Sequence, residues 1–214
     1  MVNSRKELEI ILSQLKGYIN PKEKLEQWQT PSNIASTMLF EAYIRGDIAN
    51  RKVLDLGAGT GILTIGAALL GAREVIGVEI DPDALEVAKN NLKRMERLFG
   101  HLSIRFVCDD ITNFNEHGDT VVMNPPFGLE VNTRHADILF LSKAFSLAKS
   151  IYSLHHSSDK GRKFLIHYAQ KHNFEVDLIG TFMFPLRAWH IKHKKPVKFI
   201  SVDFFLFKKI NNSF

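Results

Sequence analysis

The sequence predicts an α/β fold, in which an open and mostly parallel β-sheet carries helices on both faces. Three observations predict it. Short apolar runs of the kind that form buried parallel strands alternate with helical patterns, and they lie at residues 52–56, 74–79, 104–108 and 120–123. A glycine-rich segment follows the first run directly, and two consecutive prolines follow the last. Ligands of open α/β sheets bind at such strand ends, so both segments are candidate sites.

Composition limits the classes of protein to consider. The 214 residues are 45% hydrophobic and 24% charged, which suits one domain with a substantial core, or one domain with a small extension. No apolar run reaches the roughly 18 residues that a membrane span needs, and the first residues lack the apolar stretch of a secretory signal. The single cysteine, Cys108, excludes an internal disulfide and a cysteine-cluster zinc site. We therefore expect a cytoplasmic protein, and its net charge of +5 favours an anionic partner.

The N-terminal part of the chain predicts two helices. Four apolar residues at helical spacing indicate an amphipathic helix over residues 4–18 that packs on the main body: Leu8, Ile11, Leu12 and Leu15. A second helix is expected over residues 32–44. Thr30 is a candidate N-cap for it, with Pro31 at the first helical position. Alternatively, the hydroxyl of Thr30 and the side-chain amide of Gln27 face a ligand, and the sequence leaves both interpretations open.

A glycine-rich turn between two strands predicts a nucleoside-binding unit. The strand at 52–56 runs into Gly57-Ala58-Gly59-Thr60-Gly61, and a helix is expected over residues 62–70. Glycines permit a tight turn and let a ligand approach bare backbone at the helix N-terminus. The next strand, at 74–79, ends in Glu79, whose carboxylate could accept hydrogen bonds from both hydroxyls of a ribose.

The spacing of the glycines favours one class of cofactor. In the dinucleotide fingerprint G-x-G-x-x-G, the third glycine would fall at Ile62. The chain instead has D-x-G-x-G-x-G, from Asp55 to Gly61. This pattern is similar to the loop of methyltransferases that use S-adenosylmethionine, a cofactor without a pyrophosphate.

The segment Asn124-Pro125-Pro126-Phe127 predicts a stiff turn at the end of a buried strand. Two prolines remove two backbone donors and fix φ, so neither a helix nor an inner strand continues through them. The side-chain oxygen of Asn124 and the carbonyl oxygen of Pro125 could both accept from one planar amino group, and Phe127 offers a face for a flat ring. The amino group of a nucleobase fits this description. The alternative is that the turn is only a stiff loop, with Phe127 as a core side chain.

Together these stretches resemble the adenine N(6)-methyltransferases of the Rossmann-like class I fold. They resemble more closely the archaeal and eukaryotic methyltransferase-like enzymes that modify one adenosine in small-subunit ribosomal RNA. The resemblance implies a seven-stranded, mostly parallel sheet, an N-terminal helical extension over residues 1–30 and a methyltransferase domain over residues 31–214. The matching stretches span nearly the whole chain: Leu25-Glu26-Gln27-Trp28-Gln29-Thr30, Asp55 to Gly61, Ile80 to Leu85, Cys108-Asp109, Met123 to Gly128, Tyr152-Ser153-Leu154-His155 and His193-Lys194-Lys195.

The resemblance also implies S-adenosyl-L-methionine as the cofactor and a role for each site residue. Gln27 and Thr30 would hold its methionine end, and Glu79 its ribose. Asp109 would accept from the cofactor's adenine amino group, and the main-chain N–H of Asp110 would face the adenine ring. The amino-acid and ribose region would be lined by Asp55 and by the backbone around Gly57, Gly59, Thr60 and Ile62. Catalysis would require no metal and would use Asn124, Pro125, Pro126 and Phe127.

A basic segment late in the chain is the candidate RNA contact, and its cations are Arg187, Lys192, Lys194, Lys195 and Lys198. Such a run is often only a solvated loop. Beside a pocket for adenine we predict that it contacts RNA phosphates, with ribosomal RNA as the implied partner. The resemblance adds a small zinc-containing activator protein as a candidate partner.

The rest of the chain predicts the scaffold. Helices are expected at 136–150 and 159–172, and strands at 151–154, 175–184 and 199–207. Residues 128–135 predict a mobile loop over the substrate site. Two acids, Asp81 and Asp83, are expected to open a helix. Two histidines at a strand end, His155 and His156, could touch substrate, but we expect them to be structural.

Two other classes of function stay open at this stage. Asn-Pro-Pro-aromatic turns also occur in methyltransferases of protein glutamine and of DNA adenine, because each methylates a planar nitrogen. The second class is a non-catalytic RNA-binding assembly factor that kept the fold. Intact Asn124, Phe127, Asp55 and Glu79 argue against the second class.

Overall fold

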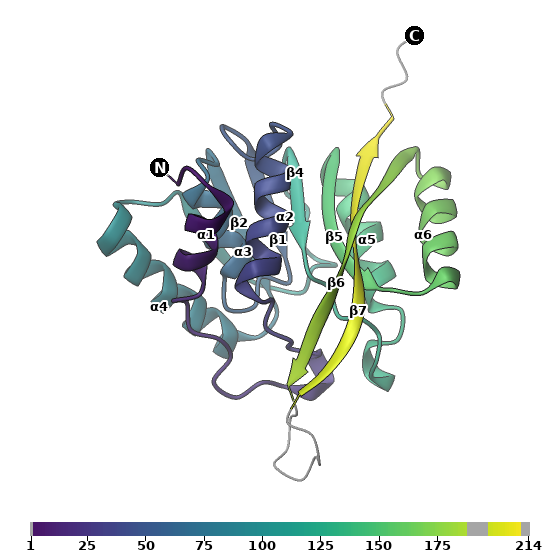
Figure 1. Ribbon diagram of the computed structural model, residues 1–214, viewed down its shortest axis with the longest axis horizontal. Helices are drawn as coiled ribbons and strands as arrows, with labels where there is room; N and C mark the ends of the chain where they lie inside the picture. Colours follow the sequence, from purple (N-terminus) through teal and green to yellow (C-terminus); the bar gives the residue numbers. More distant parts are fainter. Residues whose placement is uncertain (1, 188–196, 211–214) are drawn as a thin grey trace.

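The computed structural model describes residues 2–187 and 197–210, and its centre is a seven-stranded β-sheet (Figure 1). The strand order is β3-β2-β1-β4-β5-β7-β6. Strands β1 to β5 run parallel to one another, whereas β7 is antiparallel to both β5 and β6. The strands are β1 (Lys52–Leu56), β2 (Glu74–Glu79), β3 (Ile104–Cys108), β4 (Thr120–Met123), β5 (Ser150–His156), β6 (Phe174–Arg187) and β7 (Val197–Lys209). The predicted α/β class and mostly parallel seven-stranded sheet are confirmed.

The direction in which the sheet grows reverses at its centre, between β1 and β4. From β1 the chain builds outward through β2 to β3, and it then returns to β4 on the other side of β1. The carboxyl ends of β1 and β4 therefore flank a crevice, which is where open α/β sheets bind ligands. The glycine-rich turn and the Asn124–Phe127 turn follow these two strands, so the topology brings both candidate sites together.

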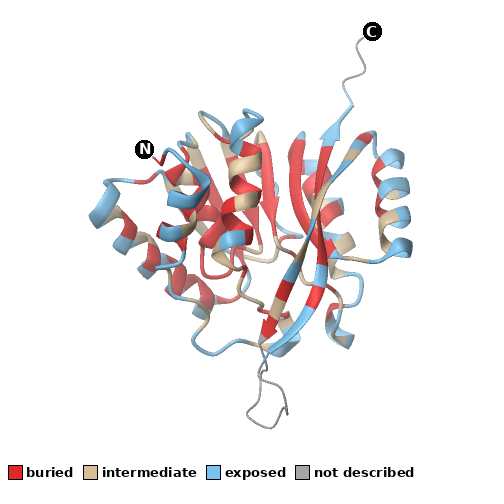
Figure 2. Cartoon of the chain, in the orientation of Figure 1, coloured by how far each residue is buried: buried red, intermediate tan, exposed pale blue. Residues whose placement is uncertain are grey.

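Helices cover both faces of the sheet, and the core has two halves (Figure 1). Successive strand residues point to opposite faces, so Val53 belongs to one half and Leu54 to the other. The first half contains side chains of α1 (Arg5–Leu12), α2 (Ser32–Ile44), α3 (Ile62–Leu69) and α4 (Pro82–Phe99). The second contains side chains of α5 (Ala136–Leu147) and α6 (Asp159–Lys171). Figure 2 shows the buried residues concentrated along the central strands and the inner sides of the helices.

The N-terminal helix packs into the same core as the rest of the domain. Its Leu8, Ile11 and Leu12 are buried against α2 and α3. Ser4 caps it, since its hydroxyl accepts a hydrogen bond from the N–H of Glu7 at 3.1 Å. The helix ends at Leu12, earlier than the predicted residue 18.

The antiparallel pair β6 and β7 is longer than the sequence predicted. The strands were expected at 175–184 and 199–207 and extend to Arg187 and from Val197. Pro185, the residue after the end of the predicted strand, lies inside β6 opposite Phe199. Because β6 is an edge strand, a residue without an N–H is tolerated there. Among residues 2–187 and 197–210, no helix has the length and apolar character needed to cross a membrane.

Candidate active site

A cavity of about 240 Å³ opens at the carboxyl ends of the central strands. It is formed by the segments that follow β1, β2 and β4, together with residues 24–30. Four of the predicted catalytic and cofactor-binding residues are absent from its wall, although their neighbours line it: Gly59, Asp109, Pro125 and Phe127. The cavity brings together the following predicted site residues: Gln27, Thr30, Asp55, Gly57, Thr60, Ile62, Glu79, Asp110, Asn124 and Pro126.

Asp55, at the end of β1, is a buried carboxyl group with one free acceptor. Its side chain is 1% exposed, and Oδ2 accepts a hydrogen bond from the hydroxyl of Thr64 at 2.6 Å. Among the residues that the structure describes, Oδ1 has no hydrogen-bond partner. Burial raises the pKa of Asp55 to about 7, against the opposing hydrogen bonds from Thr64, and the nearby Glu79 adds to the rise.

We expect this shift to make stability depend on pH. The native carboxyl keeps its proton up to about pH 7, whereas in the unfolded chain its pKa has the usual value of 3.8. The native state then binds more protons between these values, so its stability falls as the pH rises. Between about pH 5 and about pH 8 the wild type should lose about 3 kcal/mol more than Asp55→Asn, which keeps the acceptor for Thr64. Urea unfolding at both pH values measures this, and equal losses in the two proteins would contradict it.

Glu79 ends β2 and is held by backbone donors. Its Oε2 accepts from the N–H of Gly59 at 2.8 Å, and its Oε1 accepts from the N–H of Asp81 at 2.9 Å. Burial raises its pKa, and these hydrogen bonds act in the opposite direction. Each carboxylate oxygen has a second lone pair, so Glu79 can also accept from the two hydroxyls of a ribose.

Tyr18 contacts the glycine-rich turn, a contact that the sequence did not predict. A Cβ built on Gly59 would lie 2.2 Å from the Tyr18 hydroxyl oxygen, so the ring reaches the bare backbone of the turn. Burial, followed by the negative charges of Glu79, Asp55 and Asp81, raises the pKa of Tyr18 well above its usual value. The phenol therefore keeps its proton. Tyr18 lines the cavity beside the acids, and no local sequence signal placed it there.

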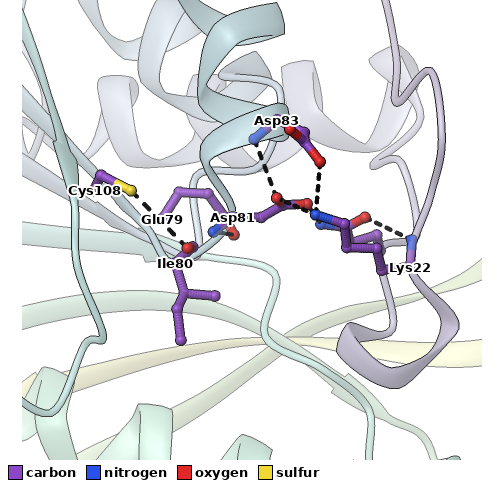
Figure 3. Close-up of polar contacts among 7 residues, drawn as sticks. Lys22, Glu79, Ile80, Asp81, Asp83 and Cys108 are labelled. Atoms are coloured by element: carbon purple, nitrogen blue, oxygen red, sulfur yellow. Dashed lines mark hydrogen bonds and ion pairs between the residues drawn. The ribbon is translucent and has the colours of Figure 1, made fainter.

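Gln27 lines the cavity and bonds to a polar network at the start of α4, of which Figure 3 shows Lys22, Asp81 and Asp83. Its Oε1 accepts from the N–H of Lys22 at 2.7 Å, and its Nε2 donates to Asp81 at 2.6 Å. The Lys22 ammonium also bonds Asp81 and Asp83, at 2.5 and 2.8 Å. Burial acts to raise the pKa of Asp81, but the hydrogen bonds from Lys22 and Gln27 hold it below its usual value. The amide of Gln27 keeps one hydrogen and one lone pair that can face a ligand.

The predicted helix-opening role of Asp81 is confirmed, and of the two interpretations left open for Thr30 the N-cap is excluded. Asp81 is the N-cap of α4 and accepts from the N–H of Asp83 at 3.1 Å. The N-cap of α2 is Pro31, and no side chain caps that helix. The Thr30 hydroxyl instead accepts from Nδ2 of Asn124 at 3.0 Å. A hydrogen bond across the site thus takes the place of a local helix cap.

Asn124, at the end of β4, presents an unpaired acceptor. The hydrogen bond to Thr30 fixes which way its amide points, because Nδ2 donates and the oxygen then lies on the other side. The oxygen, Oδ1, is buried and has no partner among the described residues. A buried acceptor without a donor costs free energy, so this oxygen is a favourable position for the donor of a ligand.

Phe127 lies in the core, the alternative that the sequence left open. It is 6% exposed and packs edge-on against Phe184, with 5.3 Å between ring centroids. The ring does not line the cavity, so stacking of a base on it requires the ring to be uncovered. The adjacent Pro126 does line the cavity.

The acids after β3 are arranged differently from the prediction. The N–H of Asp110, expected to face an adenine ring, donates to Oδ1 of Asp109 at 2.8 Å. Asn113 donates to the same oxygen at 2.9 Å. The other oxygen of Asp109 stays available as an acceptor. A contact between the Asp110 N–H and a ligand would have to replace the bond to Asp109.

Glu26 is a site residue that the sequence left without a role. Its carboxylate is 5% exposed and accepts from the N–H groups of Phe127 and Glu130, at 2.7 and 2.8 Å, and from the hydroxyl of Thr133. These bonds tie the turn after β4 to a short 3-10 helix, η2 (Val131–Thr133), inside the segment predicted to be a mobile loop. The segment lines the cavity, as expected, and its contacts to Glu26 restrain it.

The predicted RNA contacts lie largely beyond the part of the chain that the structure describes. Lys192, Lys194 and Lys195 are outside the described residues. Arg187 is the last residue of β6, and its side chain is likewise not described. Lys198 is exposed on β7, opposite Leu186. The role of this basic segment therefore stays a prediction.

The predicted structural role of His155 matches its surroundings. The ring is 1% exposed, and its Nε2 lies 2.9 Å from the hydroxyl oxygen of Ser153. Its Nδ1 lies 3.6 Å from a carboxylate oxygen of Asp137. His155 does not line the cavity.

The chain is similar to known methyltransferases over its whole length. A family model described as ribosomal protein L11 methyltransferase (PrmA) matches residues 35–125. The rRNA N(6)-adenosine-methyltransferase METTL5 of Danio rerio is 38% identical over 207 residues, which are 94% of this chain and 97% of that protein. The crystal structure of PH1948 from Pyrococcus horikoshii superposes with a TM-score of 0.87 at 41% identity, and the match covers all of both chains.

A more distant likeness concerns the fold alone. The magnesium protoporphyrin IX methyltransferase ChlM of Synechocystis has a TM-score of 0.62 at 16% identity, over 82% of this chain and 78% of that one. Three findings point to the same fold and family: the sheet order, the two turns at its switch point and the near full-length similarity to METTL5. The chain therefore has the Rossmann-like class I methyltransferase fold and belongs to the family of rRNA N(6)-adenosine-methyltransferases.

Proposed function

We propose that the protein transfers a methyl group from S-adenosyl-L-methionine to the exocyclic nitrogen of an adenosine in ribosomal RNA, most specifically that of the small subunit. The observation that carries the proposal is the unpaired oxygen of Asn124, which lies at the cavity wall with its orientation fixed by Thr30. The near full-length similarity to the rRNA N(6)-adenosine-methyltransferase METTL5 supports adenine as the nucleobase and ribosomal RNA as the RNA class.

The residues around the cavity fit the cofactor. S-Adenosyl-L-methionine, when bound, supplies a methyl group on a positively charged sulfur and carries a cationic amino group. The free Oδ1 of Asp55 is a suitable acceptor for such a cation, and Glu79 keeps acceptor capacity for a ribose. Gln27 and Thr30 line the same cavity and would hold the methionine end.

The turn after β4 can orient the acceptor amine. The adenine amino nitrogen is a poor nucleophile because its lone pair is delocalised into the ring. Hydrogen bonds from this group to Oδ1 of Asn124 and to the carbonyl of Pro125 favour a more pyramidal nitrogen and aim its lone pair. Alignment of two reactants can contribute up to about 7–11 kcal/mol in ideal cases, and the proton can leave after transfer.

The test of the function is a comparison of acceptors. The protein is incubated with labelled cofactor and, in parallel, with small-subunit ribosomal RNA, adenine-containing DNA and a glutamine-containing protein substrate. We expect label in RNA, recovered as N(6)-methyladenosine after digestion. Label in DNA or protein instead would assign one of the two other methyltransferase classes. Cofactor-dependent mass change in none of them would favour the non-catalytic assembly factor.

The basic segment should give RNA binding its salt dependence. Replacing Lys194, Lys195 and Lys198 with alanine removes up to three phosphate contacts. Each contact contributes about 0.7 to the slope of log affinity against log salt for single strands, so the slope should fall by about 2. Filter binding across a salt series measures it.

A matched control uses three lysines of α6, Lys160, Lys163 and Lys171, which are exposed and do not line the cavity. Their replacement removes the same charge and should leave the slope nearly unchanged. An equal fall in both variants would assign the effect to overall charge and would count against the basic segment.

Two further parts of the proposal concern the protein's surroundings. The resemblance supports a small zinc-containing activator protein as partner, which co-purification with the candidate activator would test. The lone Cys108 is exposed and unpaired, which supports a reducing, cytoplasmic setting. Localisation of the tagged protein in cells tests the second part.

A further inference from the structure

The conformation of Glu26 indicates a specific task for its side chain. Its backbone is left-handed, with φ of 46°, a region that costs free energy for any residue with a Cβ. Such strain persists only where surrounding contacts determine it, and it is frequent at functional sites. At this position the side chain turns inward and is 5% exposed, so the strained backbone places a carboxylate inside the protein.

The contacts of this carboxylate all lie on the acceptor side of the cavity. One oxygen accepts from the N–H of Phe127, the last residue of the Asn-Pro-Pro-Phe turn. The other accepts from the N–H of Glu130 and the hydroxyl of Thr133. The preceding prolines have no N–H of their own, so Phe127 offers the first backbone donor after Asn124. Glu26 therefore binds the turn at the first backbone N–H that follows Asn124.

The next residue in the chain reaches the opposite side. Gln27 bonds Lys22 and Asp81, beside the cofactor half of the cavity. Thr30, three residues later, bonds Asn124 itself. Residues 26–30 thus connect the nucleoside half with the acceptor turn by side-chain hydrogen bonds. Within this segment, Glu26 is the residue that bonds the backbone of the turn.

We propose that Glu26 is a positioning residue, whose carboxylate holds the backbone of the Asn124–Phe127 turn where its acceptors meet the adenine amino group. This inference rests on the proposed function. Glu26→Gln is the sharpest test because it keeps the size of the side chain. Its oxygen can still accept from Glu130 and Thr133, while its NH₂ group faces the N–H of Phe127 and loses that bond.

For Glu26→Gln we expect a fall in kcat of about 10- to 100-fold, the effect of losing one charge-assisted hydrogen bond. The affinity for S-adenosyl-L-methionine, measured by calorimetry, should stay within about twofold, because the cofactor half is untouched. The control is Glu130→Gln, which removes an equal charge from the same segment but keeps its N–H, and it should leave kcat unchanged.

Amide hydrogen exchange tests the hydrogen bonds to the Glu26 carboxylate independently of enzyme activity. In the wild type, the N–H groups of Phe127 and Glu130 should be protected, and in Glu26→Gln the N–H of Phe127 should exchange faster. Unchanged exchange, unchanged kcat, or equal losses of kcat, cofactor affinity and Tm would each overturn the proposal, the last by showing a purely structural role. If the wild type methylates no RNA, the proposed function fails, and the exchange result still decides whether Glu26 holds the turn.

Discussion

Replacing Asn124 with alanine should lower the rate of methylation by about 10²–10³-fold, the range seen when one oriented hydrogen-bonding group is removed from a reacting centre. The oxygen of Asn124 is buried, unpaired among the described residues and fixed in direction by Thr30. Without it, the adenine amino group keeps only the carbonyl of Pro125 and loses the alignment that the reaction needs. Cofactor affinity should be preserved. Single-turnover methylation of RNA and calorimetric binding of S-adenosyl-L-methionine measure the two effects.

Asn124→Asp is the matched variant for this prediction. It keeps an acceptor at the cavity but cannot donate to Thr30, so the direction of its oxygens is no longer fixed. We expect activity between those of the wild type and Asn124→Ala. Unchanged turnover in Asn124→Ala would remove Asn124 from the mechanism. A parallel loss of cofactor affinity would assign it to the cofactor half instead.

Gly59→Ala should weaken cofactor binding on the order of 100-fold, equivalent to about 2.7 kcal/mol. Gly59 has φ of 54°, where a Cβ costs about 1–2 kcal/mol. The new Cβ would also lie 2.2 Å from the Tyr18 hydroxyl oxygen, a separation that forces the ring or the turn to move. Because the N–H of Gly59 also bonds Glu79, a shift of the turn displaces the proposed ribose contact as well. Calorimetric titration with S-adenosyl-L-methionine gives the affinity.

Two further variants separate the effect of backbone strain from that of the steric clash with Tyr18. Gly71 has φ of 86° and open space where a Cβ would lie, so Gly71→Ala experiences the backbone strain alone and should bind cofactor normally. Tyr18→Phe removes the colliding oxygen, and the next ring atom would be 3.1 Å from the new Cβ. Combined with Gly59→Ala it should restore part of the affinity. If the cofactor affinity is not restored, the Tyr18 hydroxyl oxygen is not the atom that limits space at the turn.

The sequence was sufficient wherever local pattern and topology rules act together. The five parallel strands were predicted within a few residues because buried parallel strands are continuous apolar runs. The meeting of the two turns followed from their positions at strand ends, since carboxyl ends of parallel strands share one edge of a sheet. Asp55, Glu79 and Asn124 accordingly line one cavity. The pattern of glycines and the Asn-Pro-Pro-Phe turn also indicated the family to which the chain belongs.

Only the tertiary structure decided which partner each polar group takes. Thr30 caps no helix, and its hydroxyl instead accepts from Asn124, 94 residues away in sequence. Phe127 turns into the core because Phe184, on a distant strand, packs against it. Glu26 and Tyr18 act through residues far along the chain, Phe127 and Gly59, so no spacing in their own surroundings marked them. Periodicity and turn chemistry report on neighbours within a few residues, whereas hydrogen bonds and ring contacts form between whatever the fold brings within reach.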